Sequence, residues 1–336
     1  MKTNITWNQF QYESFAAIMD EFHQFDNVAG FFVGNEVIAK NDQSLAAPYI
    51  KAAARDMKKY RDSKGYRNIP IGYSAADIAE LRPNLQNYLA CGNESQAIDF
   101  FGLNAYEWCG KNDMMTSGYN TLNAMSKDLH IPIFFSETGC NTVRPRDFAD
   151  QSAILGPEMN DIWSGTMVYE WIEEANNYGI ISYGPKLEPT ATGANIEDGF
   201  TRKGQPTPVV PDYPNLKSQW ATLNPTGVAR TAYKPSLSAP ACPSSTAGGW
   251  LVNGDVPLPT IGEAITTGAS GTKIQATPTV TSKTSATGAA NSVSNSASAA
   301  SSTPTSTTGS KASGRKEIAG MAIGLVSVML GFMIWL

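Results

Sequence analysis

Short apolar runs that end in polar residues alternate with amphipathic segments along the first half of the chain. The runs predict five buried strands, at residues 28–35, 69–74, 97–104, 131–136 and 166–171. Apolar residues at helical spacing predict helices at residues 11–26, 45–59, 75–81 and 119–129, and a helical or irregular crossover at 147–155. Strands that alternate with helices are typical of an α/β fold with a parallel sheet.

The predicted strands recur at intervals of about thirty to forty residues, the rhythm of a (β/α) barrel, whose active-site residues gather at the carboxyl ends of the strands. Five strands cannot close a barrel of eight, and the first predicted element is a helix. The alternatives are an open α/β sheet and a barrel whose first strands are absent. The strand count favours the second, as does the absence of an apolar signal-peptide segment in residues 1–10.

Two of the predicted strands end in a glutamate. Residues 28–35 run into Glu36, and residues 131–136 run into Glu137. Because parallel strands place their carboxyl ends at one edge of a sheet, the two carboxylates are expected at the same edge. A retaining glycosidase uses such a pair, one group to attack the anomeric carbon and the other to protonate the leaving oxygen. The pattern therefore predicts paired-carboxylate chemistry.

Composition narrows the classes of partner and of chemistry. Thirty acidic residues against 25 basic ones give a net charge of −5, which argues against a nucleic-acid partner. The two histidines, His23 and His130, fit no catalytic triad, and no Cys/His spacing indicates a metal site. Serine hydrolases and metalloenzymes are therefore excluded, and neither a metal nor another cofactor is expected.

The second half of the chain changes character twice. From about Asp198 the pattern is irregular and proline-rich, which predicts a wrapping segment that ends the folded part at residue 243. Residues 244–313 become rich in Ser and Thr and predict a disordered, O-glycosylated stalk. Residues 314–336 are small and then apolar, which favours a glycosylphosphatidylinositol (GPI) attachment signal over a transmembrane helix.

Four motifs resemble the fungal β-1,3-glucanosyltransferases of glycoside hydrolase family 72, and they occur at residues 30–37 (GFFVGNEV), 100–109 (FFGLNAYEWC), 134–140 (FFSETGC) and 169–179 (YEWIEEANNYG). The likeness runs from about Trp7 to Cys242. It implies a (β/α)8 barrel of which this chain carries strands similar to four to eight. Since the family's amino-terminal part is lacking, the resemblance implies that this chain alone does not fold into an active enzyme.

The same resemblance implies roles for individual residues. Glu36 would be the acid/base, protonated in the first step, and Glu137 the ionised nucleophile. Asn35 would bind the sugar 2-OH, Tyr106 would orient the nucleophile, and Tyr169 would line the sugar sites.

Further implications of the resemblance concern cysteines, aromatic residues and other acids. The cysteines would pair as Cys109–Cys140 and Cys91–Cys242. The alternatives for three aromatic residues are stacking on sugar faces or packing in the core: Trp108, Trp171 and Tyr178. Four further acids are not expected to act directly in catalysis: Glu107, Glu170, Glu173 and Glu174.

The implied function is that of a cell-wall transglycosylase. It would cleave a β-1,3-glucan donor, hold the fragment on Glu137, and transfer it to an acceptor glucan chain. The implied location is the outer leaflet of the plasma membrane, through the GPI anchor, and the cell wall. Two alternatives remain: a retaining endo-β-1,3-glucanase, and a non-catalytic GPI-anchored wall mannoprotein.

Overall fold

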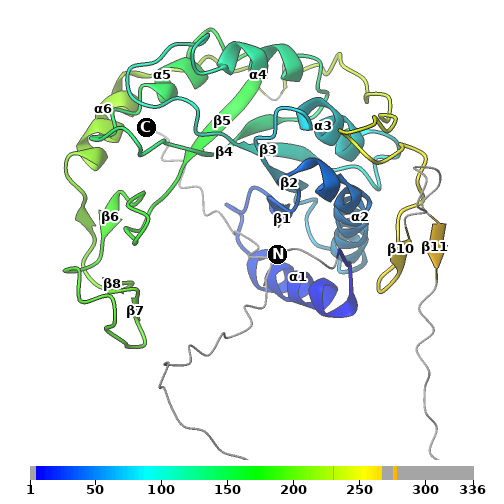
Figure 1. Cartoon of the computed structure of the whole chain (residues 1–336), viewed down its shortest axis with the longest axis horizontal. Helices are drawn as coiled ribbons and strands as arrows, with labels where there is room; N and C mark the ends of the chain where they lie inside the picture. The colour runs from blue at the N-terminus through cyan, green and yellow to red at the C-terminus, as the bar shows by residue number, and fades with distance from the viewer. Residues whose placement is uncertain (1–4, 230, 267–274, 278–336) are drawn as a thin grey trace, which may run out of the picture.

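One parallel sheet of five strands forms the centre of the molecule. The computed structural model describes residues 5–229, 231–266 and 275–277. The strands pair in chain order, and they are β1 (Phe31–Asn35), β2 (Ile71–Ala76), β3 (Phe100–Asn104), β4 (Ile133–Thr138) and β5 (Trp163–Val168). The predicted α/β class is confirmed, and each of the five predicted strands overlaps an observed one, although the last begins at Trp163 and ends at Val168 instead of running from 166 to 171. Figure 1 shows the strands and their helices arranged along an arc.

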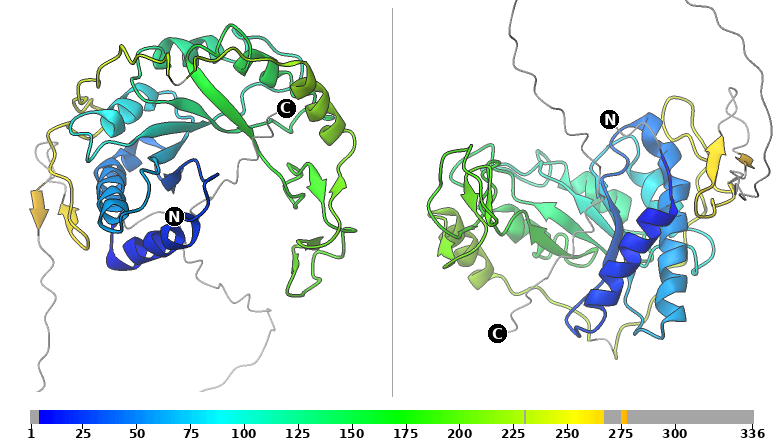
Figure 2. Two further views of the ribbon diagram at one scale, coloured as in Figure 1. Left: turned by 180° about the vertical axis from the view of Figure 1, so that it is seen from behind. Right: turned by 90° about the horizontal axis from the view of Figure 1, so that it is seen from below.

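Helices connect the strands and cover the outer side of this arc (Figures 1 and 2). The first helix, α1 (Gln9–Phe22), precedes the sheet, and its cap Asn8 exchanges hydrogen bonds with Gln11 in a capping box. The others are η1 (Asn41–Ala46), α2 (Ala47–Ser63), α3 (Arg82–Ala90), α4 (Tyr119–Ser126) and α5 (Asp150–Ile154).

The helix predicted at residues 75–81 is wrong. Ala75 and Ala76 continue β2, where they pair with Leu103 and Asn104 of β3. The helix begins at Arg82 instead, with Pro83 in its first turn, where a missing backbone N–H costs nothing. Cross-strand pairing therefore decides the conformation of two alanines that favour a helix by themselves.

The segment predicted as irregular after residue 198 contains structure that the sequence pattern did not indicate. It carries α6 (Asp212–Thr222) and short strands that form two antiparallel pairs with preceding residues, β6 (Ile181–Ser182) with β9 (Thr207–Pro208) and β7 (Ile196–Glu197) with β8 (Phe200–Thr201). A third pair joins β10 (Ala264–Thr266) to β11 (Gln275–Thr277). Two-residue strands are too short to give a visible alternation.

An aromatic layer lies on the sheet below the strand ends. The rings of Phe32, Phe100 and Phe134 contact one another at centroid distances of 5.2–6.2 Å. Phe100 occupies the space above Gly72, where an added Cβ would lie 2.2 Å from the ring. Glycine at this position therefore lets one large ring fill the layer between neighbouring strands.

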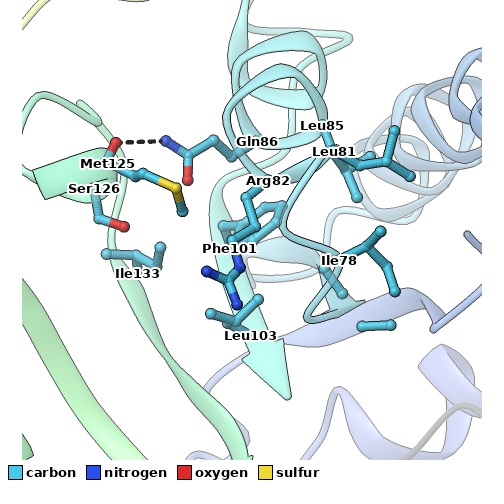
Figure 3. A pocket seen from close by; sticks show the side chains of 12 residues that line it. Ile78, Leu81, Arg82, Leu85, Gln86, Phe101, Leu103, Met125, Ser126 and Ile133 are labelled. Atoms are coloured by element: carbon cyan, nitrogen blue, oxygen red, sulfur yellow. Dashed lines mark hydrogen bonds between the residues drawn. The ribbon is translucent and has the colours of Figure 1, made fainter. Parts of the chain in front are cut away.

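A small cavity lies between the sheet and α3. Its lining includes Leu85, Phe101 and Ile133, and Gln86 beside it donates to the carbonyl oxygen of Met125 (Figure 3). The accessible space is about 10 Å³, which is room for about one water molecule. This cavity is too small for a sugar, so the candidate site lies elsewhere.

The chain packs against the helices well after residue 243, where the sequence predicts the end of the folded part. Trp250 and Val252 are fully buried, and the Trp250 ring lies 5.5 Å from the ring of Tyr88 on α3. The Cys91–Cys242 disulfide joins the same region to the end of α3. The packed part therefore reaches at least Val252, because Trp250 and Val252 both bury their side chains.

Residues 278–336, which hold most of the predicted stalk and the whole predicted GPI signal, lie outside the described residues. Within the described ranges, no helix is both long and apolar enough to cross a membrane.

Replacing Trp250 tests the packing of this late segment. Trp250→Ala should lower the free energy of unfolding by about 3–5 kcal/mol, because it empties a buried site for an indole ring. The neighbouring Leu251 is exposed, so Leu251→Ala should change stability by only about 0.5 kcal/mol. Urea unfolding measures both values, and equal effects would contradict the observed packing.

Candidate active site

The first carboxylate, Glu36, follows the last residue of β1. Its backbone N–H donates to the carbonyl oxygen of Ser74 at 2.9 Å, and its φ angle is +49°. A left-handed backbone is uncommon for a residue other than glycine, and such residues cluster at functional sites. Asn35 beside it is exposed, so both side chains stand at the carboxyl edge of the sheet.

The second carboxylate, Glu137, lies near the end of β4, which is separated from β1 by two strands. The hydroxyl of Tyr106 donates to its Oε2 at 2.7 Å. Burial raises the pKa of Glu137 above its usual value, the Tyr106 hydrogen bond lowers it, and the negative charge of Glu36 raises it again. Burial therefore opposes the ionised state expected for Glu137, and Tyr106 supports it.

The pKa of the Tyr106 hydroxyl is itself raised strongly by burial and by the Glu137 charge. It therefore remains protonated at neutral pH, where it can only donate to the carboxylate.

A buried amide, Asn104, connects the strand ends. Its Nδ2 donates to Oε1 of Glu36 at 2.9 Å and to Oδ1 of Asn35 at 3.0 Å. Its Oδ1 accepts from the hydroxyls of Ser74 and Ser136 at 2.8 and 2.7 Å. The β3–β4 register places Asn104 opposite Glu137. One amide from β3 thus links residues from β1, β2 and β4.

Three tyrosines form a wall beside Glu137. Tyr106, Tyr169 and Tyr178 meet edge to face, with ring centroids 5.3–6.4 Å apart. Burial raises the pKa of Tyr169 to about 12, so its hydroxyl is also a neutral donor. We call these three residues the tyrosine wall.

Arg146 supports the backbone behind the tyrosine wall. It is 2% exposed, and its guanidinium donates to the carbonyl oxygens of Tyr169 at 3.1 Å and Tyr178 at 2.7 Å. Its Nε donates to Asp212 of α6 at 2.7 Å, and Arg144 pairs with the same carboxylate oxygen at 3.0 Å. These contacts fix both tyrosine segments relative to α6.

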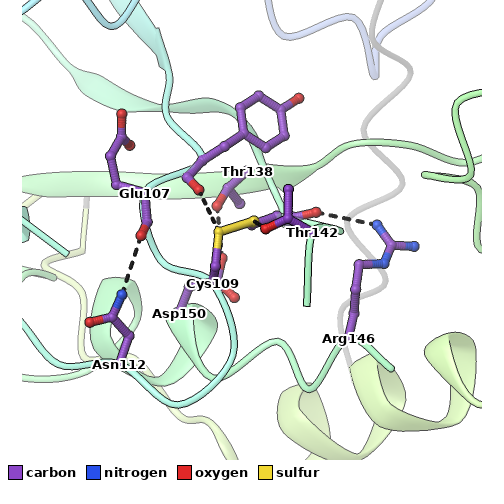
Figure 4. Close-up of a disulfide and its surroundings, with 10 residues drawn as sticks. Glu107, Cys109, Asn112, Thr138, Thr142, Arg146 and Asp150 are labelled. Carbon is purple, nitrogen blue, oxygen red and sulfur yellow. Dashed lines mark hydrogen bonds between the residues drawn. A yellow bond between two sulfur atoms is a disulfide. The ribbon is translucent and has the colours of Figure 1, made fainter. Parts of the chain in front are cut away.

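A disulfide braces the loops that follow Tyr106 and Glu137. Cys109 and Cys140, the pair that the resemblance implies, join the loop after Tyr106 to the loop after β4 (Figure 4). Asp150 lies near this bond and accepts from the hydroxyl of Thr138 at 2.7 Å. The second implied pair, Cys91–Cys242, is also present.

The remaining candidate residues take other places. Trp108 packs on Tyr119 in the interior, whereas Trp171 is 56% exposed and its Nε1 donates to the hydroxyl of Tyr183. His23 stacks on Tyr66, away from the strand ends.

The other acids have partners of their own or stand apart. Glu170 accepts from Asn176, Glu174 pairs with Arg202, Glu107 is exposed, and burial raises the pKa of Glu173. Among the described residues, no group of three or more acidic, histidine or cysteine side chains could hold a metal ion.

A shallow hollow of about 550 Å³ opens beside the strand ends. It is lined by residues 39–42, which follow Glu36, and by Ile78 and Glu80, which follow β2. Its lining combines the polar side chains of Lys40, Asn41, Asp42 and Glu80 with apolar surface, and its open shape leaves room for a hydrated chain.

Sequence reasoning missed Asn104 and Arg146. The only signal for Asn104 is its place at the end of a buried strand, inside the motif at residues 100–109. Arg146 carries no such signal, because its partner Asp212 is 66 residues away.

Comparison with known proteins decides the family. The family model described as Glucanosyltransferase, of glycoside hydrolase family 72, matches residues 1–194. The chain belongs to glycoside hydrolase family 72. The resemblance found in the four sequence motifs is confirmed.

Among its relatives, this family 72 chain is 38% identical over 254 residues to the 1,3-beta-glucanosyltransferase gas2 of Schizosaccharomyces pombe, covering 74% of this chain and 51% of that protein. It is 36% identical over 261 residues to the 1,3-beta-glucanosyltransferase GAS2 of Saccharomyces cerevisiae, and this match covers 76% of this chain and 43% of that protein. The chain thus spans about half the length of these curated relatives.

A solved structure gives the same match. It is a point mutant of Saccharomyces cerevisiae Gas2p in complex with laminaritetraose and laminaripentaose, similar with a TM-score of 0.64 at 35% identity. The match covers 75% of this chain and 52% of that one.

The raised pKa of Glu137 predicts a pH-dependent cost to stability. In the unfolded chain Glu137 ionises near pH 4.5, and in the folded chain it ionises at a higher pH. The contribution of protonated Glu137 to stability is therefore complete below about pH 4.5 and is lost as the pH rises through the folded pKa.

Glu137→Gln, which cannot ionise, should become increasingly more stable than the wild type between pH 4 and 7 in denaturant unfolding. Tyr106→Phe removes a hydrogen bond that favours the ionised form, so in that background Glu137→Gln should stabilise more. If the stability difference between Glu137→Gln and the wild type narrowed as the pH rose, folding would favour ionisation of Glu137.

Proposed function

We propose that this edge of the sheet is the catalytic centre of a retaining β-1,3-glucan transglycosylase, with Glu137 as nucleophile and Glu36 as acid/base. The observation that carries the proposal is the pair of glutamates on one hydrogen-bonded framework. Tyr106 holds Glu137, and Asn104, opposite Glu137 in the sheet, holds Glu36. Family membership and the laminari-oligosaccharides bound to the solved relative support β-1,3-glucan as the substrate.

In the first step, a carboxylate oxygen of Glu137 attacks the anomeric carbon of the donor. The glycosidic bond breaks, and its oxygen takes a proton from Glu36. The fragment on the reducing side leaves, and the other fragment stays attached to Glu137 as an ester. In the second step, Glu36 takes the proton from an acceptor hydroxyl, whose oxygen attacks the anomeric carbon and releases Glu137.

The neighbouring side chains fit these steps. Tyr106 donates to the carboxylate of Glu137, which favours the ionised form before attack and after release. Asn35 would bind the sugar 2-OH, and Tyr169, in the tyrosine wall, would line the sugar sites. Donor and acceptor glucan chains would approach along the exposed edge, where the hollow lined by residues 39–42, Ile78 and Glu80 offers room.

We further propose that the five strands correspond to strands four to eight of a (β/α)8 barrel. Within the described residues β1 and β5 form the two edges of the sheet, so closure needs additional strands. The coverage of about half of each relative supports the same interpretation. The stalk, the GPI anchor, and a place at the outer leaflet and in the cell wall stay proposals, supported by the composition of residues 278–336.

A product analysis tests the reaction. The full chain would be compared with a fusion, called the joined protein. In the joined protein, the part of Schizosaccharomyces pombe gas2 that precedes the matched region is placed before this chain. With laminari-oligosaccharides as donor, the joined protein should form products longer than the substrate. The full chain alone should form none, because its sheet is open at β1 and β5.

Site variants and alternative outcomes complete this experiment. Glu137→Gln and Glu36→Gln should each abolish elongation in the joined protein by about 100-fold or more. Only shorter products would indicate an endo-β-1,3-glucanase. Full activity in both glutamine variants would exclude a catalytic role for the pair and would favour a wall mannoprotein. Elongation by the full chain alone would contradict the need for further strands.

A further inference from the structure

We propose that Asn104 is a positioning residue that sets the orientation of both Asn35 and Glu36; the inference rests on the proposed transglycosylase function. Asn104 is 3% exposed, so its four hydrogen bonds are shielded from water. In the proposed reaction Asn104 acts through Asn35, which would bind the sugar 2-OH, and through Glu36, which would protonate the leaving oxygen.

The orientation of the Asn104 amide is fixed by its neighbours. Ser74 and Ser136 are buried at 3% and 0% exposure, and their hydroxyls donate to Oδ1 from the strands on either side. The opposite orientation would aim a carbonyl oxygen at the Glu36 carboxylate. The ionised Glu36 carboxylate, which can only accept, therefore directs Nδ2 and its two hydrogens toward Asn35 and Glu36, and the serine hydroxyls, which can donate or accept, match this orientation.

The consequence for Asn35 is a defined direction of its own amide. Its Oδ1 accepts from Asn104, so its NH₂ group is the end that turns toward the exposed edge. Asn35 thus presents a donor to the sugar. A donor at this point suits a bond to the oxygen of the 2-OH.

The consequence for Glu36 is a distinction between its two oxygens. Oε1 accepts from Asn104, so we assign the transferable proton to Oε2. A neutral amide supports both states that the reaction needs. It donates to Oε1 when Glu36 is protonated on Oε2, and it donates more strongly when Glu36 is ionised. An acidic residue in place of Asn104 would oppose the ionised state.

A thermal double-mutant cycle on the full chain tests the contact without requiring turnover. Asn104→Asp would bring a carboxylate to hydrogen-bond distance of Glu36 and lower the Tm at pH 7. In a Glu36→Gln background the drop should be smaller by about 3 °C, since one repulsion of about 1 kcal/mol is removed. The matched control combines Asn104→Asp with Glu107→Gln, because Glu107 is an exposed glutamate on the loop after β3. The Tm changes of these two substitutions should be additive.

Equal Tm losses in the two backgrounds would overturn the proposal. If Asn104→Asp does not fold, Asn104→Ala serves in the same cycle. It removes the donor from a charged acceptor, so its Tm loss should also shrink when Glu36 becomes glutamine, and additivity would again overturn the proposal.

A second measurement separates positioning from a purely structural role. The joined protein would be assayed with laminaribiosides carrying either a methylumbelliferyl or a dinitrophenyl leaving group. Dinitrophenolate departs without protonation, so Asn104→Ala should lower kcat/KM, which reports the first step, about 10-fold more for the methylumbelliferyl donor. Equal losses for both donors would show that Asn104 only maintains the fold. A wild type inactive on both donors would contradict the proposed function, and the thermal cycle would still decide the contact.

Discussion

The parallel pairing of β1 to β5 is the constraint on which the site depends. Neighbouring parallel strands all end at one edge, so side chains distant in sequence meet there without any dedicated loop. Glu36 and Glu137 come from strands separated by two others, and Asn104 lies opposite Glu137 in the register. A shift of one residue between β3 and β4 would break the contact between the Asn104 amide and the Ser136 hydroxyl. The hydrogen-bond network of Asn104 therefore requires the observed strand register. The aromatic layer below the network also stabilises this register.

Much of the fold and of the paired carboxylates could be predicted because each depends on local patterns. An apolar run that ends in an acid identifies both Glu36 and Glu137 from sequence alone. Other features depend on partners that lie far away in the chain. Arg146 binds Asp212 across 66 residues, and Trp250 packs on Tyr88 of α3. The conformation of residues 75–81 was mispredicted because pairing with β3 outweighs helix propensity.

The site combines features that are unfavourable for folding when taken singly. Glu36 has a left-handed backbone, Glu137 is partly removed from water, and Asn104 is a buried polar group. Each is tolerated because a neighbouring group compensates for it. A backbone hydrogen bond to Ser74 holds Glu36, the Tyr106 hydroxyl donates to Glu137, and serine hydroxyls donate to Asn104. Arg146 and the Cys109–Cys140 bond hold the flanking segments, so the arrangement exists before any sugar binds.

The Cys91–Cys242 bond also determines how a mechanical load would pass through the molecule. The two cysteines are 151 residues apart, and a covalent bridge between them offers tension a direct route from α3 to residue 242. A pull applied between the two ends of the chain would bypass everything between them, including Glu137 and the tyrosine wall. Glu36 lies on the loaded side of the bridge. Under tension, the shortest covalent path would thus load the segment that carries Glu36 and leave the segment that carries Glu137 slack.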